Sequence, residues 1–432
     1  MSTARTIVPA TVGLRGTLRM PGDKSIAHRA VLLGAVASGE TLVRGFTGGR
    51  DTLATVAACR ALGIPIEAEG PDLRIRGRGW DGVRAPSASI DCANSGTTMR
   101  LLTGLLAGRA FTSRLDGDAS LRRRPMRRVA EPLGHMGAVV VCEGANGCAP
   151  LRIEGRSLRG AAHRLAVASA QVKSALLLAG LQAEGATSVE EPARSRDHTE
   201  RLLTDFGATL ARDHCTVSLA GPQTLRGTIV ALPGDFSSAA FFIVAALLVP
   251  GSEIRLVDVG INPTRTGLLD ALAAMGAESA IACEPTGGGS AEPATTIIVK
   301  SARLHGARIA GELLLRAIDE FPILCVAAAC ADGTTELRNA AELRVKETDR
   351  ITAMARVLRA LGARVEELPD GIVIEGPTRF ATARVDSHGD HRIAMAAAVA
   401  ALAGDGAVTI DDAACAEVSF PGFYDALGDV RA

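Results

Sequence analysis

The hydrophobic positions of the chain gather into runs that each open on a polar motif. Six stretches share the order polar motif, Ala- and Leu-rich run with almost no charge, small residue or glycine, short apolar strand. These motifs begin at Lys24, Asn94, Ser169, Gly234, Asp319 and Gly389. A run without a polar face is typical of a helix buried on nearly all sides. The pattern therefore predicts six buried helices, each with polar residues at its N-terminal end.

A second repeat lies between these runs. It consists of a helix that ends in a Leu-Gly-Ala-like sequence, with its glycine at 63, 137, 207, 276 or 362, followed by two strands. The second of these strands is predicted at 73–77, 151–155 and 372–376. A glycine at this place is typical of a left-handed helix C-cap. Since one such unit cannot bury its own core, we expect the copies to pack on one another.

Counting the copies predicts two lobes of three repeats each. At 432 residues the chain is too long for one ordinary core. Pro233-Gly234 interrupts it midway between the third and fourth copies. A strand pair at 6–8 and 16–20 is expected to join the C-terminal half. We therefore predict one lobe from 1–20 plus 235–432 and another from 21–234, with the active site in the cleft between them.

Composition excludes several classes of protein. With 47% hydrophobic and 22% charged residues the chain is globular, and its net charge of zero argues against a nucleic-acid-binding protein. No apolar run is long enough to span a membrane, and the first residues lack the apolar core of a signal peptide. Nine scattered cysteines without a Cys-x-x-Cys pair favour a reducing, cytoplasmic location. We also expect a monomer.

The motif Pro-Gly-Asp-Lys-Ser at 21–25 predicts an anion site. Free N–H groups and the positive end of the dipole meet Lys24, Ser25 and Arg29 at the start of this helix. A single copy would equally suit a helix cap with surface cations. Cations recur at several of the six helix starts, which favours a small polyanionic ligand. No Walker loop, dinucleotide fingerprint or metal-ligand spacing is present.

Lysine is scarce in this chain, which uses arginine for most of its cations. Of 47 basic residues only Lys24, Lys173, Lys300 and Lys346 are lysine. A lysine kept in such a background suggests a need for its compact ammonium or its adjustable pKa. Lys24, Lys173 and Lys346 lie in polar motifs and are candidates for the site, whereas Lys300 follows an apolar strand and is expected to be incidental.

Two carboxylates are candidates for acid–base chemistry. Glu347 lies between Lys346 and Arg350, which are four residues apart and are predicted to share one helix face. There it could exchange a proton beside a bound anion, although an exposed, salt-bridged helix would have the same sequence. Asp319 stands at the edge of an apolar run, where a helix cap is the alternative role. His391 and Arg392 add polar groups, and a lone histidine is more often structural than catalytic.

These motifs resemble the enolpyruvyl transferase family along nearly the whole chain. The resemblance rests on Pro-Gly-Asp-Lys-Ser at 21–25 with Arg29, Asn-Ser-Gly-Thr at 94–97 with Arg100, Arg-Pro-Met at 124–126, Arg-Val-Lys-Glu at 344–347 with Arg350, and Gly-Asp-His-Arg at 389–392. The stretches 169–175 and 196–200 are similar to the bacterial subgroup called class II.

The resemblance implies an α/β (α+β) fold, a two-lobed inside-out α/β barrel in which each lobe has three βαβαββ repeats around buried parallel helices. It implies transfer of the enolpyruvyl group of phosphoenolpyruvate to the 5-hydroxyl of shikimate 3-phosphate, a step of aromatic amino acid biosynthesis. The reaction passes through a tetrahedral intermediate and requires no metal or organic cofactor.

Family roles carry over by position. Asp319 would orient or deprotonate the hydroxyl, Glu347 would exchange the methylene proton, and Lys24 would assist proton transfer. Shikimate 3-phosphate would be bound by Lys24, Ser25, Arg29, Ser169, Ala170, Gln171, Arg196, Asp319 and Lys346. Phosphoenolpyruvate would be bound by Lys24, Asn94, Gly96, Thr97, Arg124, Gln171, Arg350, His391 and Arg392.

The sequence departs from some members of the family. It has no lysine before Ser-Phe-Pro at 419–421, and His198 stands where some members have tyrosine. Gly96 by itself suggests sensitivity to the inhibitor glyphosate, a property in which class II members vary. Three alternatives stay open: transfer to UDP-N-acetylglucosamine, transfer to another hydroxylated ring acid, and a non-catalytic copy that binds phosphorylated metabolites. The segment 117–125 has no cysteine, which argues against the first of them.

Overall fold

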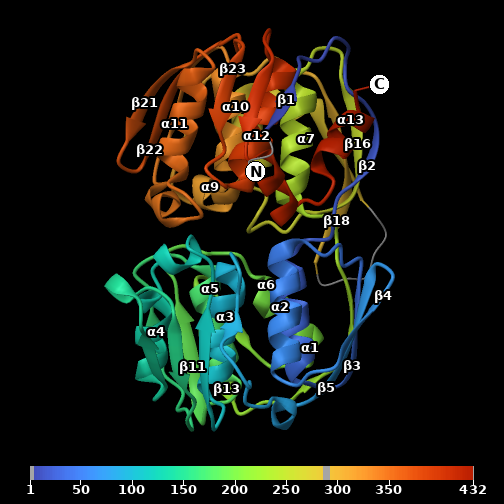
Figure 1. The fold of residues 1–432 in the computed structure, drawn as a ribbon. Coiled ribbons are helices and arrows are strands. Elements are labelled where there is room, and N and C mark those ends of the chain that lie inside the picture. The colour runs from blue at the N-terminus through green and yellow to red at the C-terminus, as the bar shows by residue number, and fades with distance from the viewer. Residues whose placement is uncertain (1–3, 286–291, 432) are drawn as a thin grey trace. The chain divides into compact units, whose positions relative to one another are not determined.

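The computed structural model describes residues 4–285 and 292–431, which divide into two compact units (Figure 1). Unit 1 contains residues up to Pro21 together with Pro233–Ala432, and unit 2 contains Gly22–Leu232. The chain thus leaves unit 1 after its first strands and returns to it at Pro233. Each unit has its own hydrophobic core.

Unit 2 is built from α1 (Lys24–Val36), β3 (Ala37–Arg44), α2 (Arg50–Ala61), β4 (Ile66–Glu69), β5 (Asp72–Arg78), β6 (Ile90–Asp91), α3 (Gly96–Ala107), β7 (Thr112–Asp116), α4 (Arg127–His135), β8 (Val139–Cys142), β9 (Leu151–Glu154), β10 (Ala162–Arg164), α5 (Ala170–Gly180), β11 (Gly185–Glu190), α6 (His198–Asp205), β12 (Ala211–Asp213), β13 (Thr216–Gly221), β14 (Leu225–Arg226) and β15 (Ile229–Ala231).

Unit 1 is built from β1 (Arg5–Ile7), β2 (Arg15–Arg19), α7 (Phe236–Leu248), β16 (Glu253–Gly260), α8 (Gly267–Leu272), β17 (Ile281–Pro285), β18 (Ala294–Lys300), β19 (Arg308–Ile309), α9 (Gly311–Arg316), α10 (Phe321–Cys330), β20 (Gly333–Leu337), α11 (Arg350–Ala360), β21 (Arg364–Leu368), β22 (Gly371–Gly376), β23 (Ala383–Asp386), α12 (His391–Ala403), β24 (Val408–Asp411) and α13 (Phe423–Asp429). Short 3-10 helices η6 (Ile318–Glu320) and η7 (Ala341–Val345) complete the segments that matter below.

The six predicted buried helices are α1, α3, α5, α7, α10 and α12. Nearly every residue of α7, α10 and α12 is buried, as expected for runs without a polar face. The five glycines predicted to end the second set of helices, at 63, 137, 207, 276 and 362, all have positive φ. This conformation places them in the left-handed region that glycine adopts without strain.

The described strands form six small sheets, and five of them share one strand pattern. In the order β6-β7-β9-β8, for example, β6 and β7 run parallel on either side of the crossover helix α3, and β7, β9 and β8 are antiparallel. Each repeat thus wraps its sheet around the outside of a buried helix. This is the inside-out α/β arrangement of repeats that the resemblance implied.

The two N-terminal strands, which were predicted as a pair, do not pair with each other. β1 is antiparallel to β24, and β2 is parallel to β16. The sixth repeat has only the three strands β1-β24-β23, so the first strand of the chain completes the sheet of the last repeat. Both partners lie in the C-terminal half of the chain, where the sequence placed them.

Gly104 allows the two core helices α3 and α5 to approach closely. A Cβ at this position would lie 2.1 Å from the carbonyl oxygen of Ala175, so an alanine would force the helices apart. We expect Gly104→Ala to lower the free energy of unfolding by about 1–3 kcal/mol, measured by denaturant titration. Gly134 in α4 is the control, because nothing lies within 4 Å of its Cβ position. Gly134→Ala should stabilise by about 0.5–1 kcal/mol, and equal effects of the two changes would contradict the packing argument.

Candidate active site

The first turns of α1, α3 and α5 carry most of the predicted residues of unit 2. Their N-cap side chains Asp23, Ser95 and Ser169 accept hydrogen bonds from the N–H groups of Ile26, Thr98 and Val172. Such caps satisfy an orphan N–H group at the start of each helix. We call the predicted residues of this unit the unit 2 cluster: Lys24, Ser25, Arg29, Asn94, Gly96, Thr97, Arg124, Ser169, Ala170, Gln171 and Arg196.

Gln171 joins α5 to α3. Its side-chain nitrogen donates to Thr97 Oγ1 over 2.9 Å, and its oxygen accepts from Arg100 Nη1 over 2.6 Å. The amide is therefore oriented by a hydroxyl on one side and a guanidinium on the other. Arg100 is a residue of the motif to which the sequence assigned no role, and the structure makes it the group that orients Gln171.

Arg124 and Asn94 form a second group beside the start of α3. Arg124 Nη2 donates to Asn94 Oδ1 over 2.7 Å, and Asn94 Nδ2 donates to Asp118 Oδ2 over 2.7 Å. Gly96 faces the same guanidinium, since a Cβ on it would lie 3.1 Å from Arg124 Nη1 and 2.9 Å from Arg100 Nη1. The absence of a side chain at Gly96 therefore leaves room for two cations.

Arg29 is buried and ties α1 to α5 and α6. Its guanidinium donates to Thr199 Oγ1 at 2.7 Å, to Ser174 Oγ at 3.0 Å and to the carbonyl oxygen of Ser25 at 2.9 Å. These contacts hold three helix starts together within unit 2. Thr199 and Ser174 received no role from the sequence, because nothing in their local pattern marks them as partners of a residue 145 or more positions away.

Lys24 has a partner that the sequence did not indicate. Its ammonium lies 2.7 Å from Asp51 Oδ2, at the start of α2, and both side chains are largely buried. Beside it, His28 Nδ1 lies 2.6 Å from Thr55 Oγ1. Burial, and then the charges of Lys24 and Arg29, hold the pKa of His28 well below its usual value. The imidazole is therefore neutral at pH 7 and adds no charge to this part of the cluster.

In unit 1 the predicted carboxylates lie around one buried guanidinium, that of Arg350. Arg350 is 1% exposed. Its Nε lies 2.8 Å from Asp390 Oδ2, its Nη2 lies 2.8 Å from Glu347 Oε2, and its Nη1 lies 3.5 Å from Asp319 Oδ1. Burial alone would lower the pKa of Arg350, but Asp390, Glu347 and Asp319 outweigh it and raise this pKa above its usual value. The two carboxylates predicted for catalysis thus share one cation.

Arg392 contacts the same carboxylate from the start of α12. Its Nη1 donates to the carbonyl oxygen of Asp319 over 3.0 Å, and its Nη2 lies 3.7 Å from Asp319 Oδ2. His391 precedes it as the first, buried residue of the helix. We call Asp319, Lys346, Glu347, Arg350, His391 and Arg392 the unit 1 cluster.

Lys346 and Arg350 do not share a helix face, so this prediction was wrong. Lys346 follows η7 in extended backbone, and α11 begins only at Arg350. The break arises because the Asp349 side chain accepts from Thr352 N and caps a new helix. Lys346 nevertheless lies near the cluster: burial lowers its pKa, and Asp319, Glu342 and Glu347 only partly offset that effect.

Comparison with known proteins identifies the group to which these motifs belong. A family model described as EPSP synthase (3-phosphoshikimate 1-carboxyvinyltransferase) matches residues 8–427. The chain belongs to the EPSP synthase family. A relative from Geobacter metallireducens named 3-phosphoshikimate 1-carboxyvinyltransferase is 53% identical over 99% of both chains. One of the same name from Desulforudis audaxviator is 54% identical over 98% of this chain and 99% of its own.

Solved structures agree with this membership of the EPSP synthase family. An EPSP synthase from Acinetobacter baumannii matches with a TM-score of 0.87 and 44% identity, covering 100% of this chain and 98% of its own. The enolpyruvyl transferase NikO from Streptomyces tendae, at 19% identity and a TM-score of 0.80, covers 100% of this chain and 98% of its own and shows the shared fold alone. The fold class expected from the sequence is confirmed, and the activity of the family is that of a transferase.

The described residues offer neither a metal centre nor a membrane-spanning helix. Among residues 4–285 and 292–431, no group of three or more His, Cys, Asp or Glu side chains could hold a metal ion. In the same part of the chain, no helix is long and apolar enough to cross a membrane.

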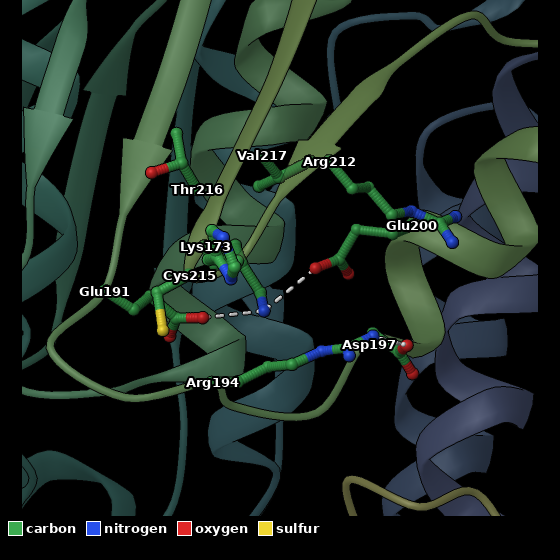
Figure 2. A pocket seen from close by; sticks show the side chains of 10 residues that line it. Lys173, Glu191, Arg194, Asp197, Glu200, Arg212, Cys215, Thr216 and Val217 are labelled. Carbon is green, nitrogen blue, oxygen red and sulfur yellow. Dashed lines mark hydrogen bonds and ion pairs between the residues drawn. The ribbon is translucent and has the colours of Figure 1, made fainter.

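A hollow of about 310 Å³ lies in unit 2 beside Lys173, lined by side chains that include Arg194, Asp197, Glu200 and Cys215 (Figure 2).

The ion pair with Asp390 offsets part of the free-energy cost of burying the charged Arg350 side chain. Removing its charge would leave that buried guanidinium with weaker charge compensation. We expect Asp390→Asn to lower the free energy of unfolding by about 3–5 kcal/mol, measured by chemical denaturation. Asp429→Asn, at an exposed position, should change it by less than about 0.5 kcal/mol. Equal stability of the two variants would show that Asp390 is not needed to bury Arg350.

Proposed function

We propose that this chain transfers the enolpyruvyl group of phosphoenolpyruvate to the 5-hydroxyl of shikimate 3-phosphate. In the first step the hydroxyl oxygen bonds to C2 of phosphoenolpyruvate and loses its proton while C3 gains one. In the second step the bond from C2 to the phosphate oxygen breaks, C3 gives up a proton and the double bond forms again. The products are 5-enolpyruvylshikimate 3-phosphate and phosphate.

The observation that carries the roles is the pair of carboxylates on one buried guanidinium. Asp319 and Glu347 both lie against Arg350 and are each 18% exposed, so a substrate could reach them. In this proposal Asp319 orients the hydroxyl or takes its proton, and Glu347 gives a proton to C3 and later removes one. A carboxylate held in a fixed place exchanges protons faster than one that must first be oriented. Lys24 assists proton transfer to the bridging oxygen.

The residues of both clusters are proposed to bind the same two substrates. Shikimate 3-phosphate is assigned to Lys24, Ser25, Arg29, Ser169, Ala170, Gln171, Arg196, Asp319 and Lys346. Phosphoenolpyruvate is assigned to Lys24, Asn94, Gly96, Thr97, Arg124, Gln171, Arg350, His391 and Arg392. Capped helix starts and guanidinium groups, as found in both units, suit phosphate and carboxylate groups. Gly96 faces the guanidinium groups of Arg124 and Arg100, so its lack of a side chain supports placing the anionic phosphoenolpyruvate beside these two cations.

We also propose that the chain acts as a monomer in the cytoplasm. All nine of its cysteines are free thiols, which is typical of a reducing compartment.

The acceptor is tested by phosphate release from phosphoenolpyruvate. We expect release with shikimate 3-phosphate and none with UDP-N-acetylglucosamine. Release with UDP-N-acetylglucosamine alone would overturn the proposed acceptor. Binding of phosphoenolpyruvate with no release in either assay would point to another hydroxylated acceptor.

Glu347→Gln tests the proposed proton transfer. The amide keeps the shape of the side chain but cannot exchange a proton as a carboxylate does, so kcat should fall by about 100- to 10,000-fold. Binding of shikimate 3-phosphate, measured by calorimetry, should change by less than about threefold. Glu312→Gln, at an exposed position of α9, is the matched control and should leave kcat unchanged. If the kcat of Glu347→Gln stayed at the level of this control, Glu347 would have no role in proton exchange.

A further inference from the structure

Lys173 is fully engaged within unit 2, although its place at the start of α5 suggested an anion ligand. The residue is 3% exposed. Its ammonium nitrogen lies 2.7 Å from Glu191 Oε2 and 2.8 Å from Glu200 Oε1 (Figure 2). It also lies 3.4 Å from the carbonyl oxygen of Ser195. An ammonium has three N–H donors, and these three acceptors account for them. Lys173 therefore has no donor left for a substrate.

The main partner of this lysine connects two segments of the proposed phosphate site. Glu191 Oε1 accepts from the backbone N–H of Ser169, the N-cap of α5, over 2.9 Å. Its Oε2 accepts from Ser195 Oγ over 2.9 Å and from Ser195 N over 3.3 Å. Ser195 directly precedes Arg196 in the chain. One carboxylate thus fixes the start of α5 and the segment that carries Arg196.

The ammonium is what keeps two carboxylates together in this buried place. Burial alone would lower the pKa of Lys173, but Glu200 and Glu191 outweigh it and raise this pKa, so the lysine is charged at pH 7. Without that charge, Glu191 and Glu200 would be two buried anions facing each other with little water to screen them. Glu200 belongs to α6, so their repulsion would move the 191–197 segment away from this helix.

The helices themselves have a separate connection. Ser174 Oγ lies 2.6 Å from Thr199 Oγ1, which joins α5 to α6 one residue after Lys173. Loss of the ammonium should therefore displace the 191–197 segment and leave the packing of the two helices in place. The hollow beside the cluster is a weaker candidate for a ligand site, because five of its charged side chains are already paired: Lys173 with Glu191 and Glu200, and Arg194 with Asp197 at 2.8 Å.

We propose that Lys173 is a positioning residue. By bridging Glu191 and Glu200 it holds the 191–197 segment, which carries Arg196, in a fixed position relative to Ser169 at the start of α5. This inference rests on the proposed function, in which Ser169 and Arg196 bind the phosphate of shikimate 3-phosphate. Lys173 acts through these residues and does not touch the substrate.

The kinetic test compares Lys173→Met with Lys300→Met. Both changes replace an ammonium by a methyl thioether of similar length, and Lys300 is 62% exposed at the end of β18. We expect Lys173→Met to raise KM for shikimate 3-phosphate at least tenfold and KM for phosphoenolpyruvate less than threefold, while Lys300→Met changes neither. Equal increases in the two KM values of Lys173→Met would contradict a role confined to the phosphate site.

A second variant separates positioning from stability. The natural cluster of one lysine and two glutamates has a net charge of −1, and Lys173→Met/Glu200→Gln keeps that net charge with Glu191 alone. The double variant removes the repulsion between the two carboxylates, so its denaturation midpoint should recover toward that of the natural protein. It still lacks the ammonium that bridges the 191–197 segment to α6, so KM for shikimate 3-phosphate should stay at least tenfold raised. Recovery of both quantities together would show that charge balance alone holds this segment and would overturn the proposed bridge.

Amide hydrogen exchange tests the same proposal without any acceptor. The N–H groups of Ser169 and Ser195 should exchange at least tenfold faster in ligand-free Lys173→Met than in Lys300→Met. Unchanged exchange would overturn the positioning role, whatever the substrate. If the natural protein fails to turn over shikimate 3-phosphate while exchange responds as expected, the proposed function fails and the structural role of Lys173 is upheld.

Discussion

The burial of the core helices on all sides is the constraint on which the structure depends. In a helix surrounded by its own sheet and its neighbours, only the N–H groups of the first turn and the C=O groups of the last turn need partners outside the helix. In five of the six core helices an Asp or Ser side chain caps the first turn, at Asp23, Ser95, Ser169, Asp235 and Asp390. The sixth, α10, has no such cap bond and begins with a proline in its first turn, where a missing N–H group does no harm. Polar chemistry therefore concentrates at helix starts.

Arg350 and Asp390 illustrate how this constraint produces a site. Asp390 caps α12 through Arg392 N and also binds the Arg350 guanidinium, so one carboxylate serves a helix end and a buried cation. That cation in turn binds Glu347, and it lies within 3.5 Å of Asp319. A group needed for folding thus fixes the groups proposed for catalysis, and the two requirements cannot be separated by a single substitution at Asp390.

The sequence predicted the repeats, the six buried helices and the glycine caps, because these follow from local patterns of apolar, polar and glycine residues. It nominated the residues of both clusters through their motifs, and the roles given to them stay a prediction. It did not predict the partners Asp51, Arg100, Thr199 and Asp390, because a hydrogen bond between residues far apart in the chain leaves no local pattern. The helix break between Lys346 and Arg350 was missed because the prediction gave Asp349 no capping role, whereas its side chain caps a new helix that begins at Arg350. The scarcity of lysine correctly marked Lys173 as unusual, yet it could not distinguish a ligand contact from a buried bridge.

The pairing of β1 with β24 has a consequence for synthesis of the protein on the ribosome. Thr6 lies opposite Thr409, so a strand made among the first residues waits for a partner made among the last. Unit 2, in contrast, is one uninterrupted segment and can complete its core while the remainder of the chain is still being translated. During that interval β1 and β2 are strands without their sheet partners, and unpaired strand edges expose a nascent chain to misassembly. β2 meets its partner β16 soon after unit 2 has been made, whereas β1 must wait for β24, so β1 is among the last strands of the protein to become paired.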